Sequence, residues 1–124
     1  MIKFFKNRIK IDMKKLDINY AGINYEERAA KIGVKPNLIH LIFKSFVDEC
    51  NSLLQNLQNS LEQKDYEKIK SYAHAIKGTA GNLQLYEIYE MAKEIELMAK
   101  EKNSDFAYNE YFEAIKNAIA TISL

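Results

Sequence analysis

The residues of this sequence best suited to chemistry lie in one short segment, residues 74–83 (HAIKGTAGNL). The apolar residues in and before this segment recur at intervals of three and four, which is typical of a helix packed on a core. They are Ile69, Tyr72, Ala73, Ile76, Ala80 and Leu83. Because a helix turns by about 100° per residue, His74 lies roughly 150° around the cylinder from this apolar stripe. We therefore predict a helix that presents the His74 imidazole to solvent.

Two glycines follow the histidine, Gly78 after four residues and Gly81 after seven. Glycine inside a helix costs about 1 kcal/mol relative to alanine, so each needs a reason. Glycine is also the residue preferred just after a helix, so Gly81, or less readily Gly78, could simply end this one. Alternatively, the missing side chains let the backbone of another macromolecule, or a phosphoryl group on the imidazole, approach the helix. The two explanations are compatible, with Gly81 at the helix end and Gly78 clearing space beside the ring.

Lys77 lies one helical turn after His74, the spacing at which helical side chains meet. An ammonium group there opposes metal binding by the histidine and favours an anion instead. A phosphoryl group on His74 would carry negative charge, and Lys77 would stabilise it, although less strongly on an open surface than in a buried site. Lys70 and Gly81 share this face and are predicted to be a secondary docking surface. The ordinary alternative is a solvated pair of polar residues without a chemical role.

Residues 74–83 resemble the signature of histidine-containing phosphotransfer (HPt) domains, which is His-x-x-Lys-Gly followed by small residues and then Asn-Leu. The preceding residues 23–49 resemble the first two helices of that family, with a Gly-Val-Lys-Pro break at 33–36 and an apolar run at 38–46. The resemblance covers residues 17–124. The chain departs from it at residues 84–85, Gln-Leu, where many members have Gly-Ala, and this bears on where the helix ends.

By this resemblance the chain is a phosphoryl carrier with little catalytic activity of its own. His74 would accept a phosphoryl group from a response-regulator receiver aspartate or from a histidine kinase, and would pass it to a receiver aspartate. Lys77 would help to neutralise the group, and Gly78 would leave room for the partner. The family analogy implies reaction at Nε2 and Mg²⁺ in the partner receiver domain, with no cofactor or metal on this chain. Two alternatives stay open: a phosphoacceptor domain excised from a larger hybrid or chemotaxis-type histidine kinase, and a helical adaptor that is not phosphorylated.

Helix-start and helix-stop signals divide the rest of the chain. Asn24 is expected to cap a short helix over residues 25–32 that Gly33 ends, and Asp65 to cap the helix of His74. The expected long helices span residues 36–62, 66–82, 85–101 and 105–122. Because connections of about two to four residues join them, neighbouring helices must run antiparallel. The predicted fold is all-α, an antiparallel up-down four-helix bundle with a short additional N-terminal helix.

Residues 1–16 are predicted to be a basic N-terminal extension to a bundle domain over residues 17–124. Apolar residues at helical spacing are interleaved there with lysine and arginine. An amphipathic helix that binds a membrane surface or a partner is one interpretation. The others are an extra helix over one end of the bundle and a frayed terminus.

Composition and the remaining reactive residues exclude other functions. A net charge of +1 gives no general attraction to nucleic acid, and a single cysteine permits no internal disulfide. No apolar run approaches the roughly 18 residues of a membrane span, so we expect a cytoplasmic protein, and a complete bundle is expected to be a monomer. Cys50 lies on the apolar stripe of its helix and His40 at the stripe's boundary, so both are expected to be structural. The sequence contains no nucleotide-binding, Ser-His-Asp or metal-ligand pattern.

Overall fold

The computed structural model describes residues 18–124, and every regular element in that range is a helix. The predicted extension at residues 1–16 lies outside the described residues. The elements are α2 (Tyr25–Ile32), a 3-10 turn (Pro36–Leu38), α3 (Ile39–Gln63), α4 (Tyr66–Asn82), α5 (Tyr86–Lys100) and α6 (Tyr108–Ala120). The all-α fold class predicted from the sequence is confirmed.

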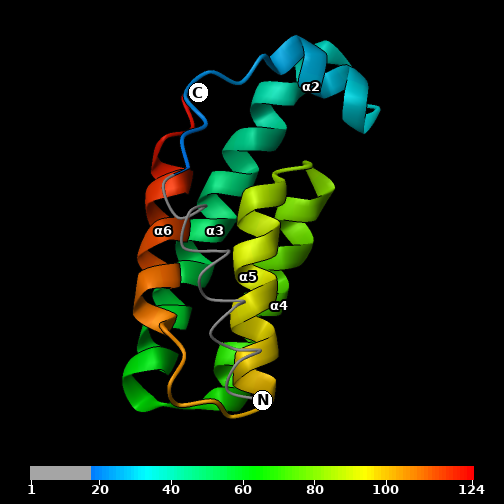
Figure 1. Ribbon diagram of the computed structural model, residues 1–124. Coiled ribbons are helices and arrows are strands. Elements are labelled where there is room, and N and C mark those ends of the chain that lie inside the picture. The colour runs from blue at the N-terminus through cyan, green and yellow to red at the C-terminus, as the bar shows by residue number, and fades with distance from the viewer. Residues whose placement is uncertain (1–17) are drawn as a thin grey trace.

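The four long helices α3 to α6 form an up-down bundle, and α2 lies at one end of it (Figure 1). Helices α3 and α5 each pack against both α4 and α6, and the α4–α5 pair is the most extensive contact. The largest fully buried side chains come from all four helices and the α4–α5 connection: Ile39, Phe43, Leu57, Ile69, Ile76, Leu85, Ile88, Met91, Ile95, Met98, Tyr111 and Ile115. This core fixes α4 by its apolar side and leaves its opposite side at the surface.

The predicted helix caps are present. The Asn24 side chain accepts a hydrogen bond from the Glu27 backbone N–H at 3.0 Å, and Gly33 ends α2 in the left-handed conformation with φ +78°. The Asp65 carboxylate likewise accepts from the Lys68 backbone N–H at 3.3 Å. Such caps satisfy donors that the first turn of a helix leaves open. Asp65 therefore fixes the start of the helix that carries His74.

Replacing Asp65 with alanine is expected to lower the free energy of unfolding by about 1 kcal/mol, because the capping hydrogen bond is lost. Asp48 offers a matched control, since its carboxylate is exposed and pairs with Lys44 one turn away at 3.1 Å. Asp48→Ala is expected to cost about 0.5 kcal/mol or less. Urea unfolding of both variants measures the difference, and equal losses would contradict a capping role for Asp65.

Two predicted helix boundaries were wrong. The helix expected from residue 36 begins with the 3-10 turn, and its α-helical part begins at Ile39. The last helix begins at Tyr108 and not at residue 105, so the connection before it spans residues 101–107. Phe106 explains the delay, because it is buried and packs its ring against Tyr108 and Tyr111 at centroid distances of 5.0 and 4.7 Å. The connection enters the core before the helix begins.

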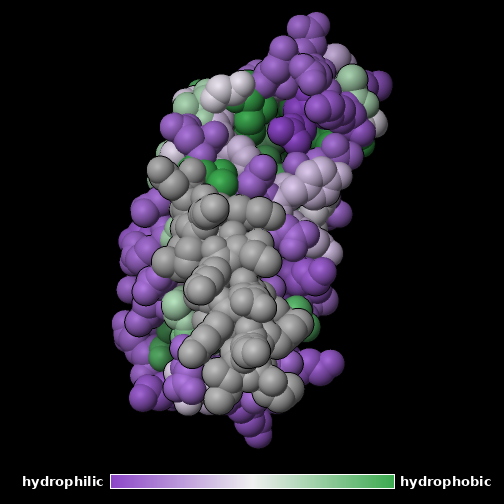
Figure 2. Space-filling model, viewed as in Figure 1, coloured by the Kyte–Doolittle hydropathy of each residue, from purple (hydrophilic) through white to green (hydrophobic). Residues whose placement is uncertain are grey.

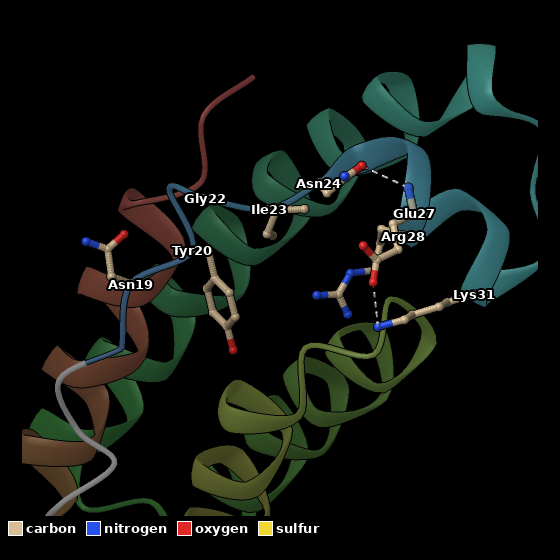
Figure 3. A pocket seen from close by; sticks show the side chains of 8 residues that line it. All are labelled: Asn19, Tyr20, Gly22, Ile23, Asn24, Glu27, Arg28 and Lys31. Carbon is tan, nitrogen blue, oxygen red and sulfur yellow. Dashed lines mark hydrogen bonds and ion pairs between the residues drawn. The ribbon is translucent and has the colours of Figure 1, made fainter.

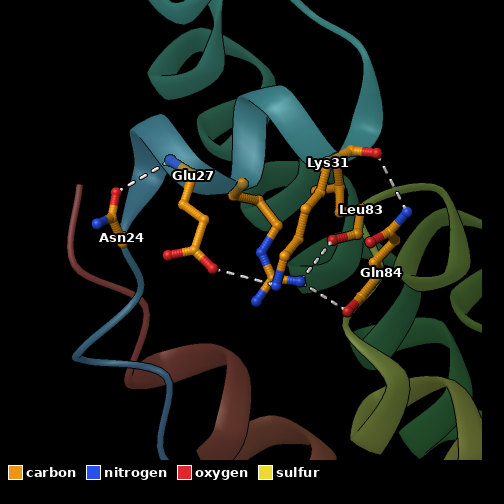
Figure 4. A network of polar contacts seen from close by, with 6 residues as sticks. Asn24, Glu27, Lys31, Leu83 and Gln84 are labelled. Carbon is orange, nitrogen blue, oxygen red and sulfur yellow. Dashed lines mark hydrogen bonds and ion pairs between the residues drawn. The ribbon is translucent and has the colours of Figure 1, made fainter.

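The chain before α3 is fastened to the end of the bundle. Arg28 of α2 donates hydrogen bonds to the carbonyl oxygens of Leu83 and Gln84, at 3.4 and 2.9 Å (Figure 4). Tyr20 is buried, and its hydroxyl donates to Glu87 of α5 at 2.7 Å; burial and then Glu87 raise the pKa of that hydroxyl. The Tyr20 and Arg28 side chains both point into a pocket at this end (Figure 3). Arg28 thus satisfies carbonyl groups that the end of α4 leaves open.

The surface in the view of Figure 2 is mostly hydrophilic where the described residues form it. Apolar side chains show there mainly in the hollow beneath α2. Within residues 18–124, no helix has the length and apolar character that crossing a membrane requires.

Candidate functional site

Helix α4 runs without interruption from Tyr66 to Asn82, so neither Gly78 nor Gly81 ends it. Its buried residues are Ile69, Ala73, Ile76 and Ala80. On the other side, the His74 side chain is 67% exposed. The predicted orientation of the imidazole toward solvent is confirmed.

His74 is held by a residue of the neighbouring helix. Glu96 of α5 places its Oε2 atom 2.8 Å from Nδ1 of His74. The other carboxylate oxygen, Oε1, lies 2.7 Å from Nζ of Lys77. Only 20% of the Glu96 side chain is exposed, and 22% of that of Lys77. The Glu96 carboxylate therefore links His74 and Lys77, the two residues of α4 that the sequence singled out.

The contact with Glu96 determines which nitrogen of His74 is available. An ionised carboxylate can only accept hydrogen bonds, so Nδ1 must carry the hydrogen of this bond. In the neutral ring the lone pair then lies on Nε2, which makes no hydrogen bond to residues 18–124. His74 thus presents an unprotonated Nε2 on an exposed face of α4.

Glu96 is ionised when these contacts form. Its partial burial acts to raise the pKa of the carboxyl group, but the hydrogen bonds from Lys77 and His74 outweigh burial, and the pKa lies below its ordinary value. Within the part of the chain that the structure describes, no group of three or more His, Cys, Asp or Glu side chains could hold a metal ion.

The two glycines of α4 differ in their surroundings. Among residues 18–124, a Cβ atom added to Gly78 would meet nothing within 4 Å, so these residues leave the space beside Gly78 open. A Cβ atom on Gly81 would lie 3.2 Å from Cδ2 of Tyr89, a residue of α5. The absence of a side chain at Gly81 therefore leaves room for the Tyr89 ring. Lys70, one turn before His74, pairs with Glu67 at 3.1 Å.

The model of the Hpt domain family matches residues 42–123, which is more than half of the chain. The chain belongs to the Hpt domain family. Comparison with curated proteins and with solved structures gave no match. Hpt domains act in histidine phosphotransfer, and they interact with receiver domains and kinases in phosphorelays.

Glu96 is not among the site residues that the sequence of this Hpt domain predicts. The residue lies 22 positions after His74, and no local spacing connects the two. A usable signal did exist, because α4 and α5 were expected to be antiparallel neighbours. Counting away from their short connection would have brought a residue near position 96 level with His74. The apolar stripe of α5 would then have shown that Glu96 flanks the core.

The other two reactive residues of the Hpt domain lie elsewhere. Cys50 is buried in α3, and burial, followed by the charge of Glu49, raises its pKa to about 12. A thiol so hard to ionise is a poor nucleophile, as expected. His40 is exposed at the start of α3, with its ring 4.6 Å from that of Tyr25. Neither residue is near His74 in sequence, and neither contacts Glu96.

Replacing Glu96 with glutamine is expected to lower the stability of the Hpt domain at neutral pH by about 1 kcal/mol, the usual size for a charge pair near the surface. The folded-state pKa of Glu96 lies below the ordinary value of 4.5, so its stabilisation is fully present above pH 4.5. That stabilisation is lost as the pH falls through the lowered pKa. Urea unfolding of both proteins across this range should therefore show a difference that shrinks in acid. A difference that is independent of pH would contradict the role given to the Glu96 charge.

Proposed function

We propose that this Hpt domain carries a phosphoryl group on Nε2 of His74, within a phosphorelay. The single observation that supports this most is the exposure of His74 together with the bond from its Nδ1 to Glu96. A rigid, exposed imidazole with one nitrogen occupied has one nitrogen left to react. Because the helix is fixed by its buried side, docking of a partner requires little ordering of the site.

The reaction moves a phosphoryl group between a carboxylate oxygen of the receiver domain and a ring nitrogen of His74. Nε2 of His74 attacks the phosphorus of a receiver aspartyl phosphate, the N–P bond forms, and the P–O bond breaks to release the aspartate carboxylate. A histidine kinase is the other possible donor. Transfer onward to a second receiver aspartate is the reverse reaction. The receiver domain supplies Mg²⁺ and most of the catalytic groups.

Lys77 and Gly78 have supporting roles in this proposal. The Lys77 ammonium stabilises negative charge on the phosphoryl group and, before reaction, neutralises Glu96. Gly78 leaves the space through which the receiver backbone approaches. Lys70 and Gly81 lie on the same face and border the docking surface.

A transfer assay tests the proposal. The chain is incubated with a phosphorylated receiver domain and Mg²⁺, and the label that it gains is examined for stability in acid and alkali. A phosphohistidine is labile in acid and stable in alkali, and it should map to the proteolytic peptide that contains residue 74. Receiver binding without any transfer would favour the adaptor alternative and would contradict the proposal.

A further inference from the structure

Glu96 contacts the side of the imidazole opposite the proposed reacting nitrogen. Its Oε2 accepts from Nδ1 at 2.8 Å, and four fifths of its side chain is shielded from water, since 20% is exposed. Hydrogen bonds to an ionised acceptor are about twice as strong as neutral ones, and shielding strengthens them further. The carboxylate therefore favours an Nδ1 that keeps its hydrogen.

That hydrogen decides how easily a phosphoryl group leaves His74. When Nε2 bonds to phosphorus while Nδ1 keeps its hydrogen, the ring carries a positive charge. If the N–P bond breaks in this state, its electron pair returns to Nε2 and a neutral imidazole leaves. If Nδ1 has first lost its proton, the ring must leave as an anion, which is far less favourable. Phosphohistidine is labile in acid for this reason.

We propose that Glu96 keeps the Nδ1 proton on His74 after phosphorylation and so shortens the lifetime of the phosphohistidine. This inference rests on the proposed function, and it concerns how that site is regulated. The hydrolysis that it accelerates is balanced. Water attacks phosphorus, the N–P electron pair returns to Nε2, inorganic phosphate is released with the protons of water, and Nδ1 keeps its hydrogen. Transfer to a receiver aspartate is accelerated by the same leaving group, so the domain is a rapid donor and a poor store of phosphoryl groups.

Other charged groups share this face and are part of the balance. They are Glu67, Lys70 and Lys77 on the His74 side of α4, and Lys93 and Lys100 on the Glu96 side of α5, as their spacings show. Lys77 is bound to Glu96 and Lys70 to Glu67. In a variant without the Glu96 carboxylate, Lys77 would lose its partner and be free to move to the phosphoryl group. That movement would also prolong the lifetime of the phosphohistidine. The test must separate this effect from that of the Nδ1 proton.

The experiment uses the full chain and the small donor phosphoramidate, which transfers its phosphoryl group to an imidazole nitrogen and releases ammonia. After the donor is removed, ³¹P NMR follows the loss of phosphohistidine in the wild type and in Glu96→Gln. At about pH 8 the half-life in Glu96→Gln is expected to be at least about fivefold longer. At about pH 5 the two half-lives should converge, because solvent then protonates the ring in both proteins. Equal half-lives at pH 8, or a ratio that does not change with pH, would overturn the inference.

Two further variants make the result specific. Glu90→Gln removes an exposed carboxylate of α5 about 120° around the helix from Glu96 and should leave the half-life unchanged. In a Lys77→Met background, Glu96→Gln should still prolong the half-life. If the extension disappears there, movement of Lys77 is the cause and the role of the Nδ1 proton is refuted. Failure of every variant, and of the wild type, to gain phosphate on His74 would refute the proposed function itself.

Discussion

His74→Gln is expected to abolish phosphoryl transfer to this Hpt domain, with the acid-labile label falling at least about 100-fold. Glutamine has a similar length but no ring nitrogen with a free lone pair, so no N–P bond can form. The side chain is 67% exposed and its loss leaves no cavity. The free energy of unfolding should therefore change by about 0.5 kcal/mol or less, apart from the contact with Glu96. Transfer from a phosphorylated receiver and urea unfolding measure the two effects.

His40→Gln is the matched control, because the chain has two histidines. His40 is also exposed and lies at the start of α3, where its ring contacts Tyr25. Its replacement should leave transfer at the wild-type level. Full labelling of His74→Gln, or loss of labelling in His40→Gln, would move the phosphoacceptor away from residue 74.

Much of the fold could be predicted because its signals are local. The capping residues Asn24 and Asp65 and the stop at Gly33 each act within a few residues, and each is present where the sequence predicts it. The start of α4 at Tyr66 follows from the Asp65 cap, and its helical character follows from a strong apolar stripe. The exposure of His74 follows from the same stripe.

The misplaced start of α6 has a tertiary cause. Spacing alone makes residues 105–122 a continuous helical pattern, and an acidic residue such as Asp105 is favoured in the first turn of a helix. In the fold, Phe106 turns into the core against Tyr111, and this packing delays the helix to Tyr108. Burying the Phe106 ring is favoured over starting the helix at residue 105. This preference depends on tertiary packing, which the local sequence pattern does not show.

The sequence predicted the individual residues of the site on α4 but not the contacts that join them to α5. His74, Lys77 and Gly78 come from one helical segment and could be found together. The carboxylate of Glu96 joins His74 to Lys77 from a different helix, so its role depends on how α4 and α5 pack. The packing reason for Gly81 is also tertiary, since Tyr89 of α5 occupies the space that a side chain would fill. The docking role of Gly81 stays a prediction.

Gly78→Leu is expected to reduce transfer from a receiver domain by about 100-fold, which corresponds to about 2.7 kcal/mol of docking free energy. The leucine side chain would project one turn from His74, where an added Cβ atom meets no described residue within 4 Å. It would prevent close approach of the receiver without touching the core. Because leucine is a better helix former than glycine, the variant should be more stable by about 0.5–1 kcal/mol. A more stable protein that transfers poorly is a result that partial unfolding could not explain.

Two controls distinguish blocked docking of the receiver domain from a loss of His74 reactivity. Phosphoramidate is far smaller than a receiver domain, so it should still phosphorylate His74 in Gly78→Leu at close to the wild-type rate. Lys68→Leu introduces the same side chain at an exposed position of α4, about 120° around the helix from His74, and should leave transfer from the receiver unchanged. If Gly78→Leu accepts phosphate from the receiver at the wild-type rate, the receiver does not approach over Gly78. If phosphoramidate also fails, the leucine acts on the imidazole itself, and the steric role given to Gly78 is wrong.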